Sequence, residues 1–197
     1  DQIESAIKKY NLEKKAKKIE KDIESEIANL IAKGKIIGIF WGREEFGPRA
    51  LGNRSIIADP RDLRIFSKLN FAIKQRDFWM PFAPSIIEDR MDKYLINPKP
   101  ARYMIESFDT KEEADEIIAG LHQADRTCRP QTVDHLNSKW RKVLDEFEKI
   151  TGVSGIINTS FNLHGYPIVG SPEIAIETFL KSGLDYLVLE DYLILKN

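Results

Sequence analysis

Short apolar runs rich in β-branched residues recur along the chain, and segments with helical spacing lie between them. Strands are predicted between Lys35 and Gly42 and at 54–58, 155–158, 186–189 and 192–195. Helices are predicted at 62–72, 111–119, 137–150 and 172–181, and an extended segment at 81–84. Because strands and helices are interspersed, the sequence predicts an α/β or α+β fold in which helices pack on a sheet.

Two of these helices have clear end signals. The helix at 137–150 places large apolar residues on one face, namely Trp140, Val143, Leu144, Phe147 and Ile150. Gly152 suits the C-cap of this helix, and Pro172 suits the first turn of the helix at 172–181.

Residues 1–33 differ in composition from the rest of the chain, because they are rich in Lys, Glu and Ile and contain no Gly or Pro. Residues spaced by three or four would form one apolar helical stripe that ends before Gly34, namely Ala16, Ile19, Ile23, Ile27 and Leu30. Asn11 is a candidate break between two helices. We therefore expect a helical linker at 1–33 and a folded domain at 34–197.

The composition excludes several classes of protein. A chain of 197 residues with 42% hydrophobic content suits one domain, and a net charge of -1 gives no global attraction to nucleic acid. The single cysteine, Cys128, cannot form an internal disulfide framework or a multi-thiolate metal site. No apolar run approaches the roughly 20 residues of a membrane span, and no signal-peptide pattern follows Asp1. We expect a cytoplasmic chain, a fragment of something longer, without a membrane or nucleic-acid partner.

Basic residues outnumber acidic ones between Arg43 and Arg76. Arg49 and Arg54 belong to the stretch GPRALGNRS, whose Gly, Pro and Asn residues are typical of tight turns and positive φ. Such a loop offers backbone N–H groups and guanidinium groups that match phosphate oxygens. The alternative is a rigid turn whose arginines pair with Glu44, Glu45 or Asp59.

A second cluster follows the predicted helix at 62–72. Lys74 and Arg76 are two residues apart, so both would point to the same side of an extended segment. Trp79 and Phe82 are expected in the core rather than as a base-stacking platform.

Two later clusters add polar groups. The segment 122–131 contains Arg126 and Arg129, and the segment NTSFN at 158–162 follows an apolar strand. Amides and hydroxyls at the end of a strand occupy the usual ligand position of open α/β sheets.

The motifs of several enzyme classes are missing. The sequence has no GxSxG elbow, no GxxxxGKS phosphate loop and no GxGxxG after a strand. His122, His135 and His164 lack metal-binding spacing, so we expect no metal site in this chain, and His135 is expected on the surface. The remaining hypothesis is an anion site that positions phosphates and neutralises developing charge.

Five stretches form a specific combination: the segment 42–61 with GPRALGNRS, PFAP at 81–84, QTV at 131–133, NTSFN at 158–162 and PIV at 167–169. From about Ile27 to the C-terminus, the chain resembles the C-terminal domain of the NodU/CmcH carbamoyltransferases. The resemblance implies a YrdC-like α/β fold with a twisted mixed sheet and flanking helices.

The resemblance also implies an activity. The domain would bind carbamoyl phosphate and ATP, with Mg²⁺ as part of the ATP complex, and form a carbamoyl-adenylate. In that family, a separate N-terminal domain of the actin-like ATPase type, with its own iron site, passes the carbamoyl group to a hydroxyl. Nothing in this chain resembles that domain, so we expect the chain alone to catalyse only the carbamoyl-adenylation half-reaction.

Carried over by position, the resemblance implies roles for individual residues. Arg49, Lys74 and Arg129 would hold phosphates as the catalytic cations, while Asn158 and Ser160 would orient the carbamoyl amide or the α-phosphate. Four more residues complete the expected binding set, namely Arg54, Arg76, Arg126 and Asn162.

The chain departs from the family pattern at three positions. Met80 stands where the family usually has Arg, Arg126 replaces a Gly, and Tyr166 replaces a carboxylate. Arg126 is a candidate to restore the charge missing at Met80. Two alternative functions remain, a non-catalytic module that binds nucleotide or RNA and a degenerate domain that stabilises its partner domain.

Overall fold

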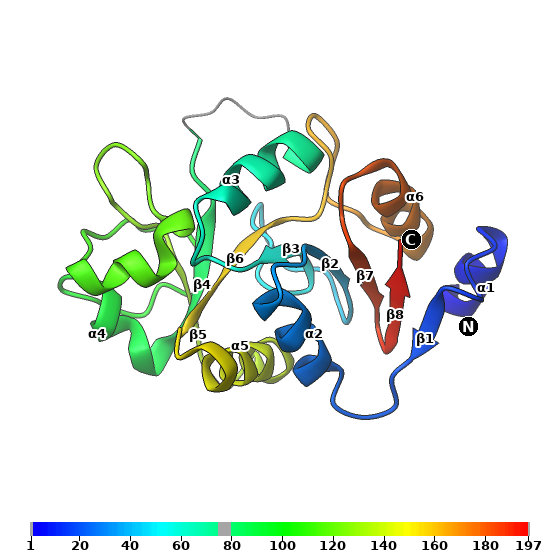
Figure 1. The fold of residues 1–197 in the computed structure, drawn as a ribbon, viewed down its shortest axis with the longest axis horizontal. Coiled ribbons are helices and arrows are strands. Elements are labelled where there is room, and N and C mark those ends of the chain that lie inside the picture. The colour runs from blue at the N-terminus through cyan, green and yellow to red at the C-terminus, as the bar shows by residue number, and fades with distance from the viewer. Residues whose placement is uncertain (1, 75–79, 197) are drawn as a thin grey trace.

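The protein is described by a computed structural model over residues 2–74 and 80–196. Its strands are β1 (Ala16–Lys18), β2 (Ile37–Phe40), β3 (Arg54–Ala58), β4 (Ala83–Ile87), β5 (Gln131–Val133), β6 (Gly155–Ser160), β7 (Tyr186–Leu189) and β8 (Tyr192–Leu195). They form one sheet in the order β1-β8-β7-β2-β3-β6-β4-β5 (Figure 1). The pairs β2–β7 and β4–β5 are parallel and the other pairs are antiparallel, so the predicted mixed sheet is confirmed.

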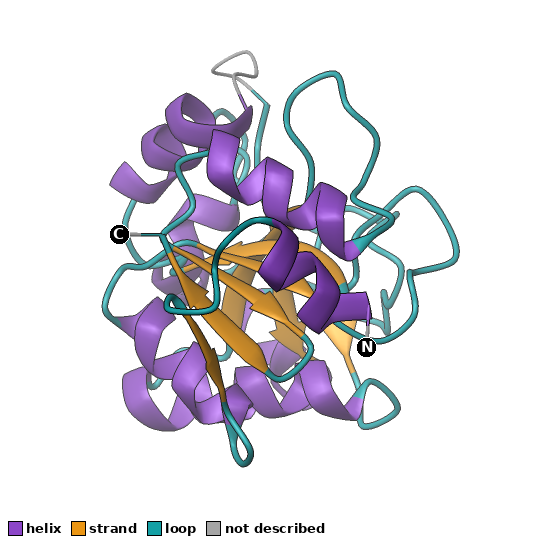
Figure 2. Ribbon diagram, turned by 90° about the vertical axis from the view of Figure 1, so that its right-hand side faces the viewer, coloured by secondary structure: helices purple, strands orange, loops and turns teal. Residues whose placement is uncertain are grey.

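Helices cover both faces of this sheet (Figure 2). The α-helices are α1 (Gln2–Lys9), α2 (Ile23–Ala32), α3 (Arg64–Leu69), α4 (Met91–Tyr94), α5 (Ser138–Thr151) and α6 (Pro172–Lys181). A π-helix, η1 (Asn70–Lys74), extends α3, and two 3₁₀ helices are η2 (Glu88–Arg90) and η3 (Glu112–Gly120). Along β2, Ile37 and Ile39 face the core under α2 and α5, while Ile36 and Phe40 face α1, α3 and α6. The fold therefore has three layers.

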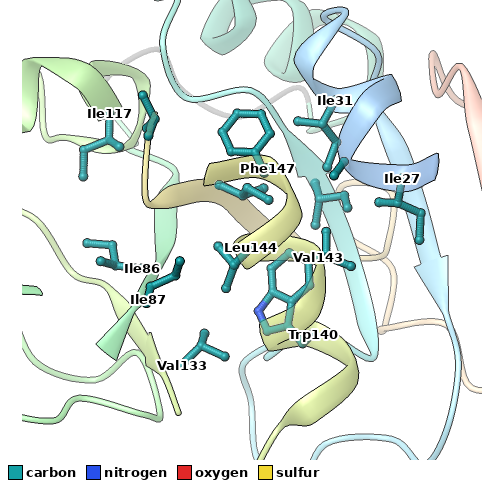
Figure 3. Packing of buried hydrophobic residues seen from close by; sticks show 14 of the residues in the cluster. Ile27, Ile31, Ile86, Ile87, Ile117, Val133, Trp140, Val143, Leu144 and Phe147 are labelled. Atoms are coloured by element: carbon teal, nitrogen blue, oxygen red, sulfur yellow. The ribbon is translucent and has the colours of Figure 1, made fainter. Parts of the chain in front are cut away.

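Helices α2 and α5 pack together against one face of the sheet (Figure 3). Four of the five residues predicted on the apolar face of α5 are buried, namely Trp140, Val143, Leu144 and Phe147. Ile150 was expected with them but is 46% exposed, because it lies in the last turn, beyond the reach of the sheet. Gly152 has φ 76°, which confirms it as the C-cap.

The N-terminal region is not continuously helical. The predicted stripe is correct for Ile23–Ala32, but Ala16 lies in β1, which pairs antiparallel with β8. Asn11 and Asp22 adopt positive φ of 55° and 58°, so helical geometry stops after α1 and resumes only at α2. The helical prediction for residues 16–18 is therefore wrong, whereas the domain boundary at residue 33 stays a prediction.

The other predicted elements appear with small shifts, whereas β5, α4 and η2 form where no element was predicted. The helix predicted at 62–72 appears as α3 continued by η1, and the extended segment at 81–84 leads into β4. The helix predicted at 111–119 is the 3₁₀ helix η3, interrupted at Ile117, which has φ −120°. Within residues 2–74 and 80–196, the helices are too short or too polar to cross a membrane.

Candidate functional site

One carboxylate oxygen closes the loop at residues 43–53, hereafter the β2–β3 loop. Glu45 Oε1 accepts hydrogen bonds from the backbone N–H groups of Leu51 at 2.7 Å, Asn53 at 2.7 Å and Arg54 at 3.2 Å. Hydrogen bonds to an ionised group are stronger than neutral ones, so Glu45 holds the turn that contains Arg49 in one conformation.

Neighbouring elements anchor the same loop. Leu51 O accepts hydrogen bonds from the side-chain amides of Gln131 at 2.8 Å and Asn137 at 3.0 Å. Gly52 has φ +120°, and a Cβ at this position would lie 2.6 Å from Cγ of Trp140. Only glycine fits here, because both the backbone angle and the contact with α5 exclude a side chain.

The described residues do not form the ion pairs of the rigid-turn alternative. Glu45 binds backbone N–H groups, and Asp59 pairs with Arg61 at 2.6 Å. Arg49 is exposed and makes no ion pair or hydrogen bond within residues 2–74 and 80–196. Its guanidinium group therefore remains available to a ligand.

Arg54 supports the loop from inside the protein. Its side chain is buried at the start of β3, 3.7 Å from the centre of the Phe40 ring. Its guanidinium donates hydrogen bonds to Trp41 O at 2.7 Å and Gly42 O at 3.1 Å. Burial lowers the pKa of this guanidinium, and the charge of Glu45 opposes that effect. These contacts favour loop support over the ligand contact predicted for Arg54.

A small hollow, hereafter the central hollow, brings four of the predicted site residues together. Its described lining consists of Pro48, Arg49, Ala50, Pro81, Phe82, Ala83, Met104, Arg129, Asn158, Thr159 and Ser160, around a cavity volume of about 50 Å³. The two arginines come from different parts of the chain, and Arg129 Nη1 donates to Met104 O at 2.8 Å. Phe82 is buried, as predicted for a core residue.

Asn158 stands at the centre of a buried polar network in β6. Its Nδ2 lies 3.0 Å from Ser85 Oγ on the adjacent strand β4 and 3.1 Å from Gln131 Oε1 on β5, the strand beyond β4. Its Oδ1 is buried and has no hydrogen-bond partner among the described residues. A buried acceptor without a partner costs roughly 1–3 kcal/mol, so this atom is suited to a ligand N–H group.

Gln131 and Ser85 were not among the predicted site residues. They hold Asn158 in place through a 2.6 Å hydrogen bond from Ser85 Oγ to Gln131 Oε1. The sequence offers only a weak signal for them, a polar residue in each of two short buried strands, and their pairing depends on the register between β4 and β5.

Ser160 and Asn162 end the same strand. Ser160 Oγ donates to Asn162 Oδ1 at 2.7 Å, and Asn162 Nδ2 donates to Tyr166 O at 2.6 Å. Ser160 lines the central hollow, whereas Asn162 orients Ser160 and fixes the following loop.

The remaining predicted residues lie elsewhere or outside the described residues. Lys74 is the last residue of η1 and its side chain is not described, while Arg76 and Trp79 lie wholly outside the described residues. Arg126 pairs with Asp115 at 2.7 Å and lines neither the central hollow nor its neighbour, so the structure does not show it replacing the charge missing at Met80.

A second hollow adjoins the first and is hereafter the side hollow. It shares Arg129 and residues 81–83 with the central hollow, and its other described lining residues are Ser107, Gly120, His122 and Thr127. Its volume is about 120 Å³. Arg129 therefore stands where the two hollows meet.

A larger hollow of about 550 Å³ lies near the opposite end of β3, between Lys33 and Lys68. Its two arginines already have partners, Arg61 with Asp59 and Arg64 with Asp62. The segment 42–61 reaches it only through Asp59 and Arg61, and neither GPRALGNRS nor NTSFN lines it, so the two smaller hollows are the better candidate site. Within the described parts of the chain, we find no group of three or more His, Cys, Asp or Glu residues that would hold a metal ion.

Comparisons with known proteins show the family of this chain. The family model for the carbamoyltransferase C-terminus matches residues 28–196. An uncharacterised Methanocaldococcus jannaschii protein, MJ1058, is 43% identical over 169 residues, which are 85% of this chain and 28% of that protein. Nodulation protein NolNO of Sinorhizobium fredii is 40% identical over 179 residues, 89% of this chain and 26% of that protein. The chain thus spans only about a third or less of such relatives.

Two solved structures share the fold. Full-length HypF in its phosphate- and nucleotide-bound form matches with a TM-score of 0.60 at 18% identity, over 88% of this chain and 21% of that one. A H234A/Y235A variant of Sua5 from P. abyssi matches with a TM-score of 0.54 at 16% identity, over 78% of this chain and 42% of that one. The predicted YrdC-like fold is confirmed.

Proposed function

The chain belongs to the carbamoyltransferase C-terminal family, and from this premise we propose that it binds carbamoyl phosphate and ATP and forms a carbamoyl-adenylate. One observation carries the proposal. Within the described lining of the central hollow, two arginines accompany a buried amide oxygen that has no hydrogen-bond partner.

The chemistry of this hollow matches carbamoyl phosphate in both of its parts. Arg49 and Arg129 offer planar guanidinium groups, which bind phosphate oxygens through paired hydrogen bonds. Asn158 Oδ1 needs a donor, and the NH₂ group of carbamoyl phosphate is one. Ser160 adds a hydroxyl to the same lining.

The nucleotide needs more space than the central hollow provides. A volume of about 50 Å³ has room for a few waters or a small group. ATP would extend beyond it past Arg129 along the side hollow, with Lys74 and Arg76 as further proposed cations. HypF, with the same fold, was solved with phosphate and nucleotide bound, which supports this assignment.

Magnesium would enter with ATP. No carboxylate is among the described lining residues of either hollow, so these residues fit Mg²⁺ only through ATP phosphate oxygens and water. The acceptor hydroxyl, the N-terminal transfer domain and its iron are proposals for the longer protein, as is a cytoplasmic location.

The proposed reaction consumes one water. Carbamoyl phosphate, ATP and water give carbamoyl-adenylate, phosphate and pyrophosphate, because two anhydride bonds break and only one forms. We assign the cleavage in carbamoyl phosphate to the bond between the carbamoyl carbon and the bridging oxygen, so that the oxygen of water joins the carbamoyl carbon to the α-phosphorus. The residues of the central hollow would hold the carbamoyl group and neutralise charge as each phosphate departs.

The test is pyrophosphate release from ATP with and without carbamoyl phosphate. We expect release to require carbamoyl phosphate, and Arg49→Ala and Arg129→Ala each to weaken it by about 10- to 100-fold, since each removes a charge-assisted contact. Arg64→Ala is the matched control, because Arg64 is 92% exposed and outside both hollows.

Two results would contradict the proposal. One is ATP binding without any pyrophosphate release in the presence of carbamoyl phosphate, which would favour the non-catalytic binding module, or ATP turnover that does not depend on carbamoyl phosphate. The other is an equal rate of pyrophosphate release in the Arg49, Arg129 and Arg64 variants, since only Arg49 and Arg129 line the central hollow.

A further inference from the structure

His122 and Asp125 form a pair at the side hollow. His122 Nδ1 lies 2.9 Å from Asp125 Oδ1. The same oxygen accepts hydrogen bonds from the backbone N–H of Thr127 at 2.9 Å and from its hydroxyl at 2.8 Å. The backbone N–H of His122 donates to Thr127 O at 2.9 Å, so the turn at 122–127 fixes the ring relative to the carboxylate.

These hydrogen bonds decide which ring nitrogen carries the proton. The bonds from Thr127 hold the pKa of the Asp125 carboxyl below its ordinary value, so this group is ionised near neutral pH. An ionised carboxylate only accepts hydrogen bonds, so His122 donates from Nδ1. Its Nε2 then has a free lone pair and no hydrogen bond within residues 2–74 and 80–196. A carboxylate that fixes the tautomer and orientation of a histidine is the arrangement of a general base.

The position of His122 connects this pair to the proposed substrate. The side hollow shares four residues with the central hollow, including Arg129. Among the described lining residues of both hollows, His122 has the one imidazole, and the other lining side chains are arginine, uncharged polar or apolar. His122 is therefore the candidate general base among them.

The proposed reaction needs such a group. Water must be deprotonated as it attacks a carbonyl carbon, and the departing phosphate must be protonated. Arg49 and Arg129 cannot serve, since a guanidinium remains charged throughout. A histidine can do both in turn.

We propose, resting on the function above, that His122 is the base that activates the water consumed with carbamoyl phosphate. His122 Nε2 takes a proton from the water while the water oxygen forms a bond to the carbamoyl carbon. The bond from that carbon to the phosphate oxygen breaks, and the imidazolium returns the proton to the departing phosphate. Carbamic acid loses its remaining proton to solvent, and carbamate then attacks the α-phosphorus of ATP, which releases pyrophosphate.

The experiment compares carbamoyl phosphate, which must undergo attack by water, with carbamate, which is the product of that attack. Pyrophosphate release is measured with ATP and carbamoyl phosphate, and separately with ATP and ammonium carbamate, which bypasses the water attack. With carbamoyl phosphate, we expect His122→Gln to slow release by about 100-fold or more and Asp125→Asn to slow it by a smaller factor. With carbamate, both variants should remain within about threefold of the unaltered chain.

The matched control is His135→Gln, because the His135 side chain is 81% exposed and lies outside both hollows. This variant should match the unaltered chain with both substrates. A His122→Gln variant with full activity on carbamoyl phosphate, or with equal losses on both substrates, overturns the inference alone. An unaltered chain that releases no pyrophosphate with either substrate overturns the proposed function and this inference together.

Discussion

Glu45 shows how a single side chain prepares the site without lining it. Its Oε1 accepts three backbone N–H groups from the far side of the loop that contains Arg49. The sequence suggested Glu45 as an ion-pair partner for an arginine, because spacing alone does not tell a carboxylate that binds backbone from one that binds a guanidinium. The structure leaves Arg49 exposed as a result.

Removing this carboxylate should loosen the loop. Glu45→Ala leaves three N–H groups without their acceptor, so we expect a loss of about 1–3 kcal/mol in the free energy of unfolding. We also expect weaker binding of carbamoyl phosphate. Glu45→Gln keeps one acceptor oxygen, so it should recover part of the lost stability and part of the lost binding of carbamoyl phosphate. Urea unfolding and the KM for carbamoyl phosphate measure the two effects, and an unchanged KM in Glu45→Ala would count against a positioning role.

Two glycines of the same loop form a matched pair. Gly47 and Gly52 have φ of +130° and +120°, but a Cβ at Gly47 meets nothing within 4 Å, whereas one at Gly52 meets Trp140 at 2.6 Å. Gly47→Ala should cost about 1 kcal/mol from backbone strain alone, and Gly52→Ala roughly 1–3 kcal/mol more from the clash. Urea unfolding compares them, and equal losses would show that the contact with α5 does not hold this loop.

Among the elements, the sequence predicts strands β2, β3, β6, β7 and β8 well and β4 only as an extended segment at 81–84, and it misses the two edge strands β1 and β5. Strands such as β2 and β3 are buried on both faces, so they read as continuous β-branched runs. Strand β1, with the sequence AKK, has no such run. Its pairing depends on the exposed edge of β8, which only the folded sheet provides.

The N-terminal segment should therefore contribute measurably to stability. Removal of residues 1–20 would take away α1, β1 and buried Ile3 and Ile7, each large side chain contributing roughly 1.5–3 kcal/mol on burial. We expect a lower Tm, and hydrogen exchange that is faster in β8 than in β6. Equal hydrogen-exchange protection of β8 in the full chain and in the chain without residues 1–20 would instead show that the N-terminal segment is a loosely attached linker.

At the scale of the whole molecule, the central hollow joins residues distant in the sequence. The β2–β3 loop, the start of β4, Arg129 two residues before β5 and the end of β6 all contribute to its lining. Four residues that the sequence and its resemblance predict as site residues, Arg49, Arg129, Asn158 and Ser160, line this hollow, and their roles in binding stay predictions. The sequence and its resemblance did not predict that Arg54 points into the protein or that Arg126 pairs with Asp115, because those outcomes depend on three-dimensional packing.

Cys128 is buried in the hydrophobic core, so its thiol tests whether this part of the core excludes solvent. Burial raises the pKa of its thiol from an ordinary value of 9.0 to about 12. Above the ordinary value, the unfolded chain loses this proton and the folded chain keeps it, so the stability contribution present at lower pH is lost as pH rises from about 9 to 12. The slope approaches about 1.4 kcal/mol per pH unit. Urea unfolding at several pH values measures how the free energy of unfolding changes with pH in the unaltered chain and in Cys128→Ala. The difference between the two slopes is the contribution of the thiol, and identical slopes would show that the thiol is accessible to solvent.

In the proposed function, the central hollow recognises both the phosphate and the carbamoyl amide of its ligand. Carbamoyl phosphate and acetyl phosphate differ by NH₂ against CH₃, so their relative affinity tests the role of Asn158 Oδ1 most directly. By calorimetry, we expect carbamoyl phosphate to bind about 10- to 100-fold more tightly, because acetyl phosphate leaves this buried acceptor unsatisfied. Arg49→Ala should weaken both ligands by similar factors. Equal affinity of the unaltered chain for the two ligands would show that Asn158 Oδ1 does not recognise the carbamoyl amide.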